Sequence, residues 1–69
     1  MLSMKLHEAI AFARAGKGLT LRDLEDKTGI SNGLLSQIES GYVKNPSFRN
    51  VVKISKALGL SLNRLAETD

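Results

Sequence analysis

Apolar side chains recur at three- and four-residue spacing along most of this chain, which is the period of helices with one buried face. Glycines separate the apolar segments, so each predicted helix is short. The predicted helices cover about residues 3–17, 20–28, 31–40, 47–58 and 61–67. Because the connections between them are only about two to six residues long, the sequence predicts an all-α fold, a compact five-helix bundle rather than an up-and-down arrangement of long helices.

Serine or threonine is the first residue of each of the last four predicted ranges, where its side chain can accept a hydrogen bond from the first turn of the helix. These predicted N-caps are Thr20, Ser31, Ser47 and Ser61. Asp23, three residues after Thr20, completes a variant of the capping box. Gly29 follows the second helix, where a residue in the left-handed conformation commonly ends a helix.

The dipeptide Asn32-Gly33 has two interpretations. Between two strands, Asn-Gly is a strong signal for a tight hairpin turn. A hairpin needs alternating apolar residues on both sides, and Ile30 is the only apolar residue close upstream. Downstream, Leu35 and Ile38 follow a helical spacing. The stretch is therefore predicted to be a helix with Asn32 and Gly33 in its first turn.

Composition excludes several classes of function. The chain has 69 residues, no cysteine and one histidine, His7. This length predicts one small domain, residues 1–69, and the composition excludes disulfides and thiolate or multi-histidine metal sites. No serine has an activating partner at a recognisable spacing, so an enzyme is not expected, nor is a cofactor or metal. His7 is expected on the surface of the first helix.

No apolar run reaches the roughly 18 residues of a membrane span, and charges interrupt the apolar N-terminal region. The expected location is a reducing cytoplasm, with no membrane partner. Positive charge is concentrated in one part of the chain: residues 1–39 have five basic and five acidic residues, whereas residues 40–66 have five basic residues and none that is acidic. A nucleic acid suits such a segment, although a basic surface without a partner explains the charge equally well.

Two predicted helices, at residues 20–28 and 31–40, are joined by a short connection that contains Gly29. This arrangement is typical of a helix-turn-helix, whose second helix can enter the major groove of DNA. Four apolar residues are expected to hold the pair together: Leu24, Ile30, Leu35 and Ile38. Asparagine and glutamine on the other face can each form two hydrogen bonds with adenine. A solvated helix face is the alternative for these polar residues.

Residues 18–67 resemble the Cro/XRE-type helix-turn-helix family of DNA-binding regulators, which includes the lambdoid phage repressors. The resemblance rests on the segments GLT, GIS, LSQIESG and ISKALGLSLNRL, together with Leu24 and Pro46. It implies a lambda repressor-like DNA-binding domain with the helix-turn-helix at about residues 20–40.

The resemblance also implies roles for individual residues. The positions that match base contacts are Asn32, Gly33, Ser36 and Gln37. Those that match phosphate contacts are Thr20, Leu21, Arg22, Ser31, Lys44 and Asn45. Arg14 and Glu39 match a pair that forms an internal salt bridge in many members. Leu21 stands where the family often has glutamine, which leaves its backbone N–H as the available donor. Glu25 replaces a usual alanine and is expected to reach solvent or a basic partner.

The function implied is a sequence-specific, double-stranded DNA-binding transcriptional regulator of bacterial or phage origin, acting as a repressor or autoregulator. One small module contacts few base pairs, so we expect a homodimer on an inverted repeat, with Leu60, Leu62 and Leu65 at the dimer interface. The alternative is a protein-interaction module that uses the same scaffold to bind a toxin or a polymerase subunit.

Overall fold

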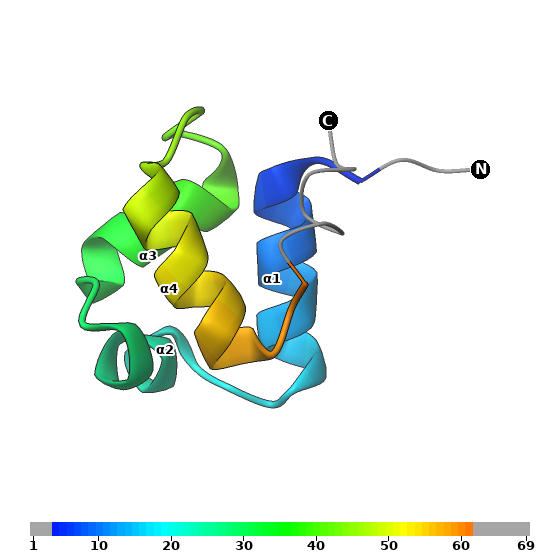
Figure 1. The fold of residues 1–69 in the computed structure, drawn as a ribbon, viewed down its shortest axis with the longest axis vertical. Coiled ribbons are helices and arrows are strands. Elements are labelled where there is room, and N and C mark those ends of the chain that lie inside the picture. The colour runs from blue at the N-terminus through cyan, green and yellow to red at the C-terminus, as the bar shows by residue number, and fades with distance from the viewer. Residues whose placement is uncertain (1–3, 62–69) are drawn as a thin grey trace.

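The computed structural model describes residues 4–61, and all the regular structure in this range is helical. The helices are α1 (Leu6–Gly16), α2 (Leu21–Thr28), α3 (Asn32–Ser40) and α4 (Phe48–Leu58) (Figure 1). The predicted all-α class is confirmed, with four helices here where five were predicted for the chain. The fifth, predicted over residues 61–67, lies outside the described residues apart from its expected N-cap, Ser61. Within residues 4–61, no helix is both long and apolar enough to cross a bilayer.

The first helix starts later than the predicted residue 3. The N–H of Lys5 donates a hydrogen bond of 3.0 Å to the carboxylate of Glu8, so the chain turns into α1 at Leu6. An acidic residue in the first turn also interacts favourably with the positive end of the helix dipole. The helix ends close to its predicted position, at Gly16.

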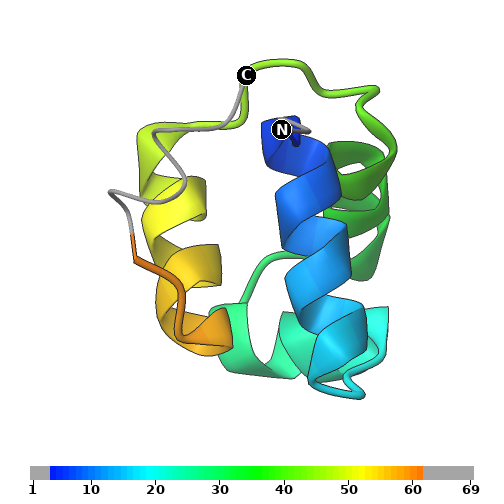
Figure 2. The ribbon, with the colours of Figure 1, turned by 90° about the vertical axis from the view of Figure 1, so that its right-hand side faces the viewer.

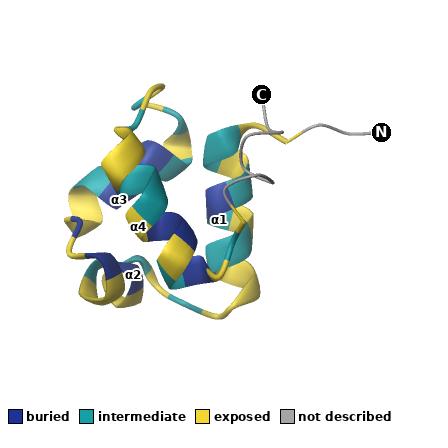
Figure 3. Ribbon diagram, viewed as in Figure 1, coloured by how far each residue is buried: buried dark blue, intermediate teal, exposed yellow. Residues whose placement is uncertain are grey.

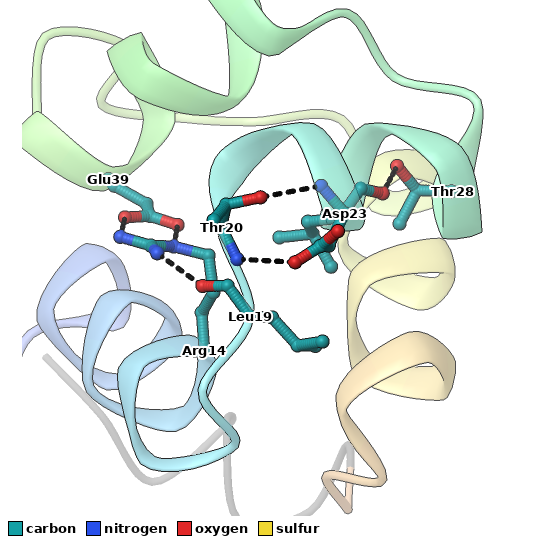
Figure 4. Close-up of polar contacts among 7 residues, drawn as sticks. Arg14, Leu19, Thr20, Asp23, Thr28 and Glu39 are labelled. Carbon is teal, nitrogen blue, oxygen red and sulfur yellow. Dashed lines mark hydrogen bonds and ion pairs between the residues drawn. The ribbon is translucent and has the colours of Figure 1, made fainter.

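The caps of the next three helices are confirmed. The hydroxyl of Thr20 accepts a hydrogen bond from the N–H of Asp23 at 3.0 Å, and the carboxylate of Asp23 accepts one from the N–H of Thr20 at 2.9 Å (Figure 4). The hydroxyls of Ser31 and Ser47 each accept from the backbone N–H three residues on. Gly29 ends α2 at a φ of 75°. These local bonds satisfy helix-end groups that would otherwise lack partners.

Seven apolar side chains form the core where the four helices meet. They are Ile10, Leu24, Ile30, Leu35, Ile38, Ile54 and Leu58. Helix α3 packs against both α1 and α2, and α4 packs against α2 and α1 (Figures 1 and 2). Buried residues face the middle of the bundle and exposed ones the outside (Figure 3). Each fully buried aliphatic side chain stabilises the fold by about 1.5–3 kcal/mol, so this core fixes the relative positions of α2 and α3.

Thr28 closes the turn between α2 and α3 in a way the sequence pattern did not predict. Its buried hydroxyl donates to the carbonyl of Leu24 at 2.7 Å and accepts from the N–H of Ile30 at 3.1 Å. One side chain therefore joins the last turn of α2 to the first buried residue after it. Because both partners are backbone groups, the bonds set the path of the chain into α3.

His7, predicted on the surface of the first helix, is partly exposed there and also contacts a neighbouring helix end. The residue is half-buried, on the side of α1 that faces the end of α3. Its imidazole ring lies directly against Gly41, the C-cap of α3. The face of α1 that contacts its neighbours is thus wider than the apolar pattern alone indicated.

Candidate nucleic-acid interface

One side of α3 is polar and exposed to solvent. Its four exposed residues near the helix start are the predicted base-contacting set: Asn32, Gly33, Ser36 and Gln37. They form two adjacent pairs, and the second pair follows the first after about one helical turn. Leu35 and Ile38 on the opposite side are buried in the core. The structure therefore brings all four together on one surface.

This surface carries no unpaired acidic group from its own helix. The only charged residue in α3 is Glu39, and its carboxylate is held by Arg14 of α1. Arg14 Nε lies 2.7 Å from Glu39 Oε2, and Arg14 Nη2 lies 2.9 Å from Glu39 Oε1 (Figure 4). The neutral side chains at the start of α3 can thus approach a polyanion without repulsion from an uncompensated carboxylate.

The ion pair also fixes the path of the chain before α2. Nη1 of Arg14 donates a third hydrogen bond, of 2.7 Å, to the carbonyl of Leu19. The side chains of Arg14 and Glu39 are only 21% and 9% exposed. The hydrogen bonds that Arg14 donates to the carboxylate of Glu39 raise the pKa of Arg14 above its ordinary value, against the lowering effect of burial. The structure therefore brings the two predicted partners together and links α1, α3 and the N-terminal end of α2.

The residues predicted to contact phosphate occupy three places around α3. Thr20 and Arg22 are exposed at the N-terminal end of α2, whereas Leu21 is half-buried and packs against the core. Because the side chain of Leu21 points inward, leucine is tolerated at this position. The backbone N–H of Leu21 belongs to the first turn of α2, where helix N–H groups have no partner within the helix. Ser31 is exposed as the N-cap of α3.

The third place is the loop between α3 and α4. Lys44 and Asn45 are exposed there, and Pro46 is half-buried behind them. The N–H of Val43 donates to the carbonyl of Gln37 at 3.2 Å, which holds the start of the loop against the last turn of α3. A lysine ammonium in such a loop can contact a phosphate as a point charge.

Two further predictions concern Glu25 and the leucines near the end of the chain. Glu25 is half-buried and forms no ion pair with another residue in the 4–61 range. In the same range, every fully buried polar side-chain atom has a hydrogen-bond partner. Its carboxylate thus keeps contact with solvent.

Leu60 is half-buried and packs against the core. Leu62 and Leu65, also predicted at a dimer interface, lie outside the described residues.

Comparison with known proteins matches residues 10–65 to a family described as Helix-turn-helix. Two curated relatives are named HTH-type transcriptional regulator SinR. The one from Bacillus subtilis (strain 168) is 35% identical over 54 residues, which are 78% of this chain and 49% of the relative. The one from Bacillus licheniformis is 36% identical over 52 residues, which are 75% and 47% of the two chains. This chain thus spans about half the length of either relative.

Two solved structures are also similar. One is described as the master regulator for biofilm formation SinR in complex with DNA; it has a TM-score of 0.82 and 33% identity, and the match covers 88% of this chain and 97% of that one. The other is the P22 c2 repressor protein in complex with synthetic operator 9T in the presence of Tl+, with a TM-score of 0.84, 28% identity and coverage of 97% and 100%.

Proposed function

We propose, since this chain belongs to the helix-turn-helix family, that it is a sequence-specific DNA-binding transcriptional regulator, a repressor or autoregulator. The main observation behind the proposal is the start of α3, where four exposed residues with small or neutral polar character lie together on a helix anchored by a buried opposite face. A helix presented in this way fits the major groove of double-stranded DNA.

In this proposal α3 contacts the bases. Asn32 and Gln37 carry amides that can form paired hydrogen bonds with adenine, and Ser36 can donate or accept. Gly33 has no side chain, and nothing in the protein lies within 4 Å of where a Cβ would be. The bare backbone there allows the helix to come close to a base edge.

The flanking groups fix the position of α3 on the duplex. Contacts to phosphate carry little sequence information but set the register of the protein on DNA. The proposed phosphate contacts are the start of α2 at Thr20, Leu21 and Arg22, the N-cap Ser31, and the loop residues Lys44 and Asn45. The positive ends of the α2 and α3 dipoles favour phosphate at two of these places.

The proposal includes a homodimer on an inverted repeat. A single α3 contacts few base pairs, and two copies on one face of the duplex would have half-sites about 34 Å apart. Leu60, Leu62 and Leu65 are the proposed contacts between the copies.

Enrichment of binding sites from a library of randomised duplexes tests this function. At about 50–100 mM salt the protein should enrich one symmetric sequence, and its affinity for that sequence should fall log-linearly with salt, by a slope of about 0.9 per phosphate contact. The enriched site should bind roughly a thousandfold more tightly than a scrambled duplex of equal length. Failure to enrich any duplex in this salt range would exclude the regulator.

A protein-interaction module, binding a toxin or a polymerase subunit, is the second candidate. One observation favours it: both phenylalanines and the one tyrosine of this chain are open to solvent, with Phe12 70%, Tyr42 77% and Phe48 75% exposed. Aromatic residues are enriched at protein interfaces. The same enrichment experiment separates the candidates, because a protein-binding scaffold without DNA function selects no duplex at any salt concentration.

A further inference from the structure

His7 is placed so that it supports the loop between α3 and α4. If Gly41 carried a Cβ, that atom would lie 3.0, 3.1 and 3.3 Å from Cε1, Nε2 and Nδ1 of the His7 ring. The ring is thus in close contact with the backbone at the point where α3 ends. Gly41 has a φ of 85°, so both its conformation and the nearby ring favour glycine.

The same ring lies beneath the loop. His7 lines a cavity of about 50 Å³ whose other walls are Leu6, Ile38, Val43, Lys44 and Pro46. Figure 2 shows the loop passing over the N-terminal end of α1, and the cavity lies between them. A residue of α1 and the lysine proposed to contact phosphate are therefore neighbours, although they are far apart in the sequence.

The middle of the loop has little else to hold it. Tyr42 and Val43 are fixed by backbone hydrogen bonds to groups at the end of α3. The next backbone bonds begin at Ser47, where α4 starts. Between these points, residues 44–46 form no backbone hydrogen bond with another residue that the structure describes. Their position depends on packing against the side chains beneath them.

Helix α1 holds the end of α3 at two points. His7 and Arg14 are seven residues apart, which is two helical turns, so both side chains lie on the same face of α1. Arg14 binds Glu39 in the last turn of α3, and His7 contacts Gly41 immediately after it. The first contact positions the helix, and the second positions the chain that leaves it.

We propose that His7 is a positioning residue for the DNA-backbone contact of Lys44. This inference rests on the proposed function, because it assigns His7 to the same protein–DNA interface. The imidazole acts through its bulk: it occupies part of the space between α1 and the loop, so that Lys44 stays where its ammonium reaches a phosphate. His7 itself does not contact DNA.

The test measures affinity for the enriched duplex over a range of salt concentrations, using the whole chain. The variants are His7→Ala, Lys44→Ala and the double substitution. Phe12→Ala is the matched control, since it also removes an aromatic ring from α1 but at an exposed position. Circular dichroism establishes that each variant is folded, which is expected because none of these residues belongs to the buried core.

We expect His7→Ala to weaken binding about tenfold, within the range usual for coupled neighbours. The slope of log affinity against log salt concentration should fall by about one per protomer, which is the change expected when one phosphate contact is lost. In the Lys44→Ala background, His7→Ala should have no further effect, and base preference should not change. Phe12→Ala should bind as the unsubstituted chain does. Independent, multiplicative losses from the two substitutions would overturn the proposal, as would unchanged binding by His7→Ala.

A second variant separates bulk from polarity. His7→Phe keeps a flat ring, and the adjoining cavity has room for the extra atom, so this variant should restore both affinity and salt slope. If it behaves as His7→Ala does, the proposal is wrong. The failure of the proposed function has a different signature: in that case the unsubstituted chain enriches no duplex, whereas failure of this inference alone leaves enrichment intact and His7→Ala without effect.

Discussion

Arg14 holds both carboxylate oxygens of Glu39, a residue 25 positions further along the chain. The planar guanidinium matches the planar carboxylate, so the pair gains two charge-assisted hydrogen bonds and a defined orientation. A third bond to the carbonyl of Leu19 uses another donor of the same group. One side chain of α1 thus sets the position of the end of α3 and of the chain entering α2.

The two partners of this pair should not contribute independently to the stability of the fold. Removing both should cost less free energy of unfolding than the sum of the two single removals. Glu39→Ala leaves a largely covered guanidinium with only the Leu19 carbonyl, and should lower the free energy of unfolding by about 2 kcal/mol. Arg14→Met combined with Glu39→Ala should cost less than the sum of the two single substitutions. Urea unfolding of the three variants measures this coupling. Strict additivity would show that the pair contributes no mutual stabilisation.

Gly41→Ala should cost more than Gly29→Ala. Both glycines end helices at positive φ, which costs alanine about 1 kcal/mol or more. At Gly29 nothing lies within 4 Å of the new Cβ, whereas at Gly41 the Cβ meets the His7 ring. Crowding of this kind adds about 1 kcal/mol or more. Thermal and urea unfolding should show the difference, and His7→Ala should remove most of it.

Gly33→Ala should separate stability from DNA binding. Gly33 lies in α3 without positive φ, and a Cβ there meets no protein atom. Alanine should therefore stabilise the free protein by about 0.5 kcal/mol or more. Binding to the enriched duplex should nevertheless fall about tenfold, because the Cβ occupies space that the proposed close approach requires. A variant that is more stable and binds equally well would contradict the role given to Gly33.

Gln37→Ala and Arg22→Ala should have different effects on specificity. Loss of a base contact should relax the preference at one base pair, with a cost of about 1–3 kcal/mol on the preferred sequence. Loss of the proposed phosphate contact at Arg22 should weaken binding to every sequence equally and reduce the salt slope. Repeating the library enrichment with each variant compares them. An equal loss on all sequences for Gln37→Ala would remove that residue from the base-contacting set.

Asp23 should give α2 a pH-dependent contribution to stability. The backbone hydrogen bond from Thr20 lowers the pKa of Asp23 below its ordinary value of 3.8. A carboxyl whose pKa is lower in the folded state stabilises the fold when ionised, and this contribution is lost as pH falls through the folded-state pKa. The chain should therefore be more stable than Asp23→Asn above about pH 4, and the difference should shrink below that. Thermal unfolding at several pH values measures it; a difference that persists at pH 2 would contradict the assignment.

The features predicted well from the sequence are those that depend on nearby residues. The capping of α2 by Thr20 and Asp23 involves groups three residues apart, and the burial of Leu35 and Ile38 follows from the helical period. Such signals need no knowledge of the tertiary fold. The exposed polar start of α3 is the other face of the same period, which explains why its residues could be named in advance.

Two contacts were missed, one between distant segments and one within a turn. His7 has no apolar signal, and its position is set by Gly41, which lies 34 residues away. Thr28 is a local case: it lies four residues after Leu24, on the same face of α2, but its residue type alone does not show that the hydroxyl bridges Leu24 and Ile30. Residue type does not distinguish His7 from a solvated side chain, because its partner is determined by the packing of the whole chain.

The separation of the α3 surface from the core has an evolutionary consequence. Asn32, Ser36 and Gln37 are exposed, and none belongs to the set of side chains that holds the four helices together. Exposed substitutions usually change stability by no more than about 0.5 kcal/mol. If the proposed function holds, a lineage can therefore exchange these residues, and with them the preferred DNA site, while the fold remains the same. Duplicated copies of such a gene could diverge toward separate targets within a few substitutions, without passing through an unfolded intermediate.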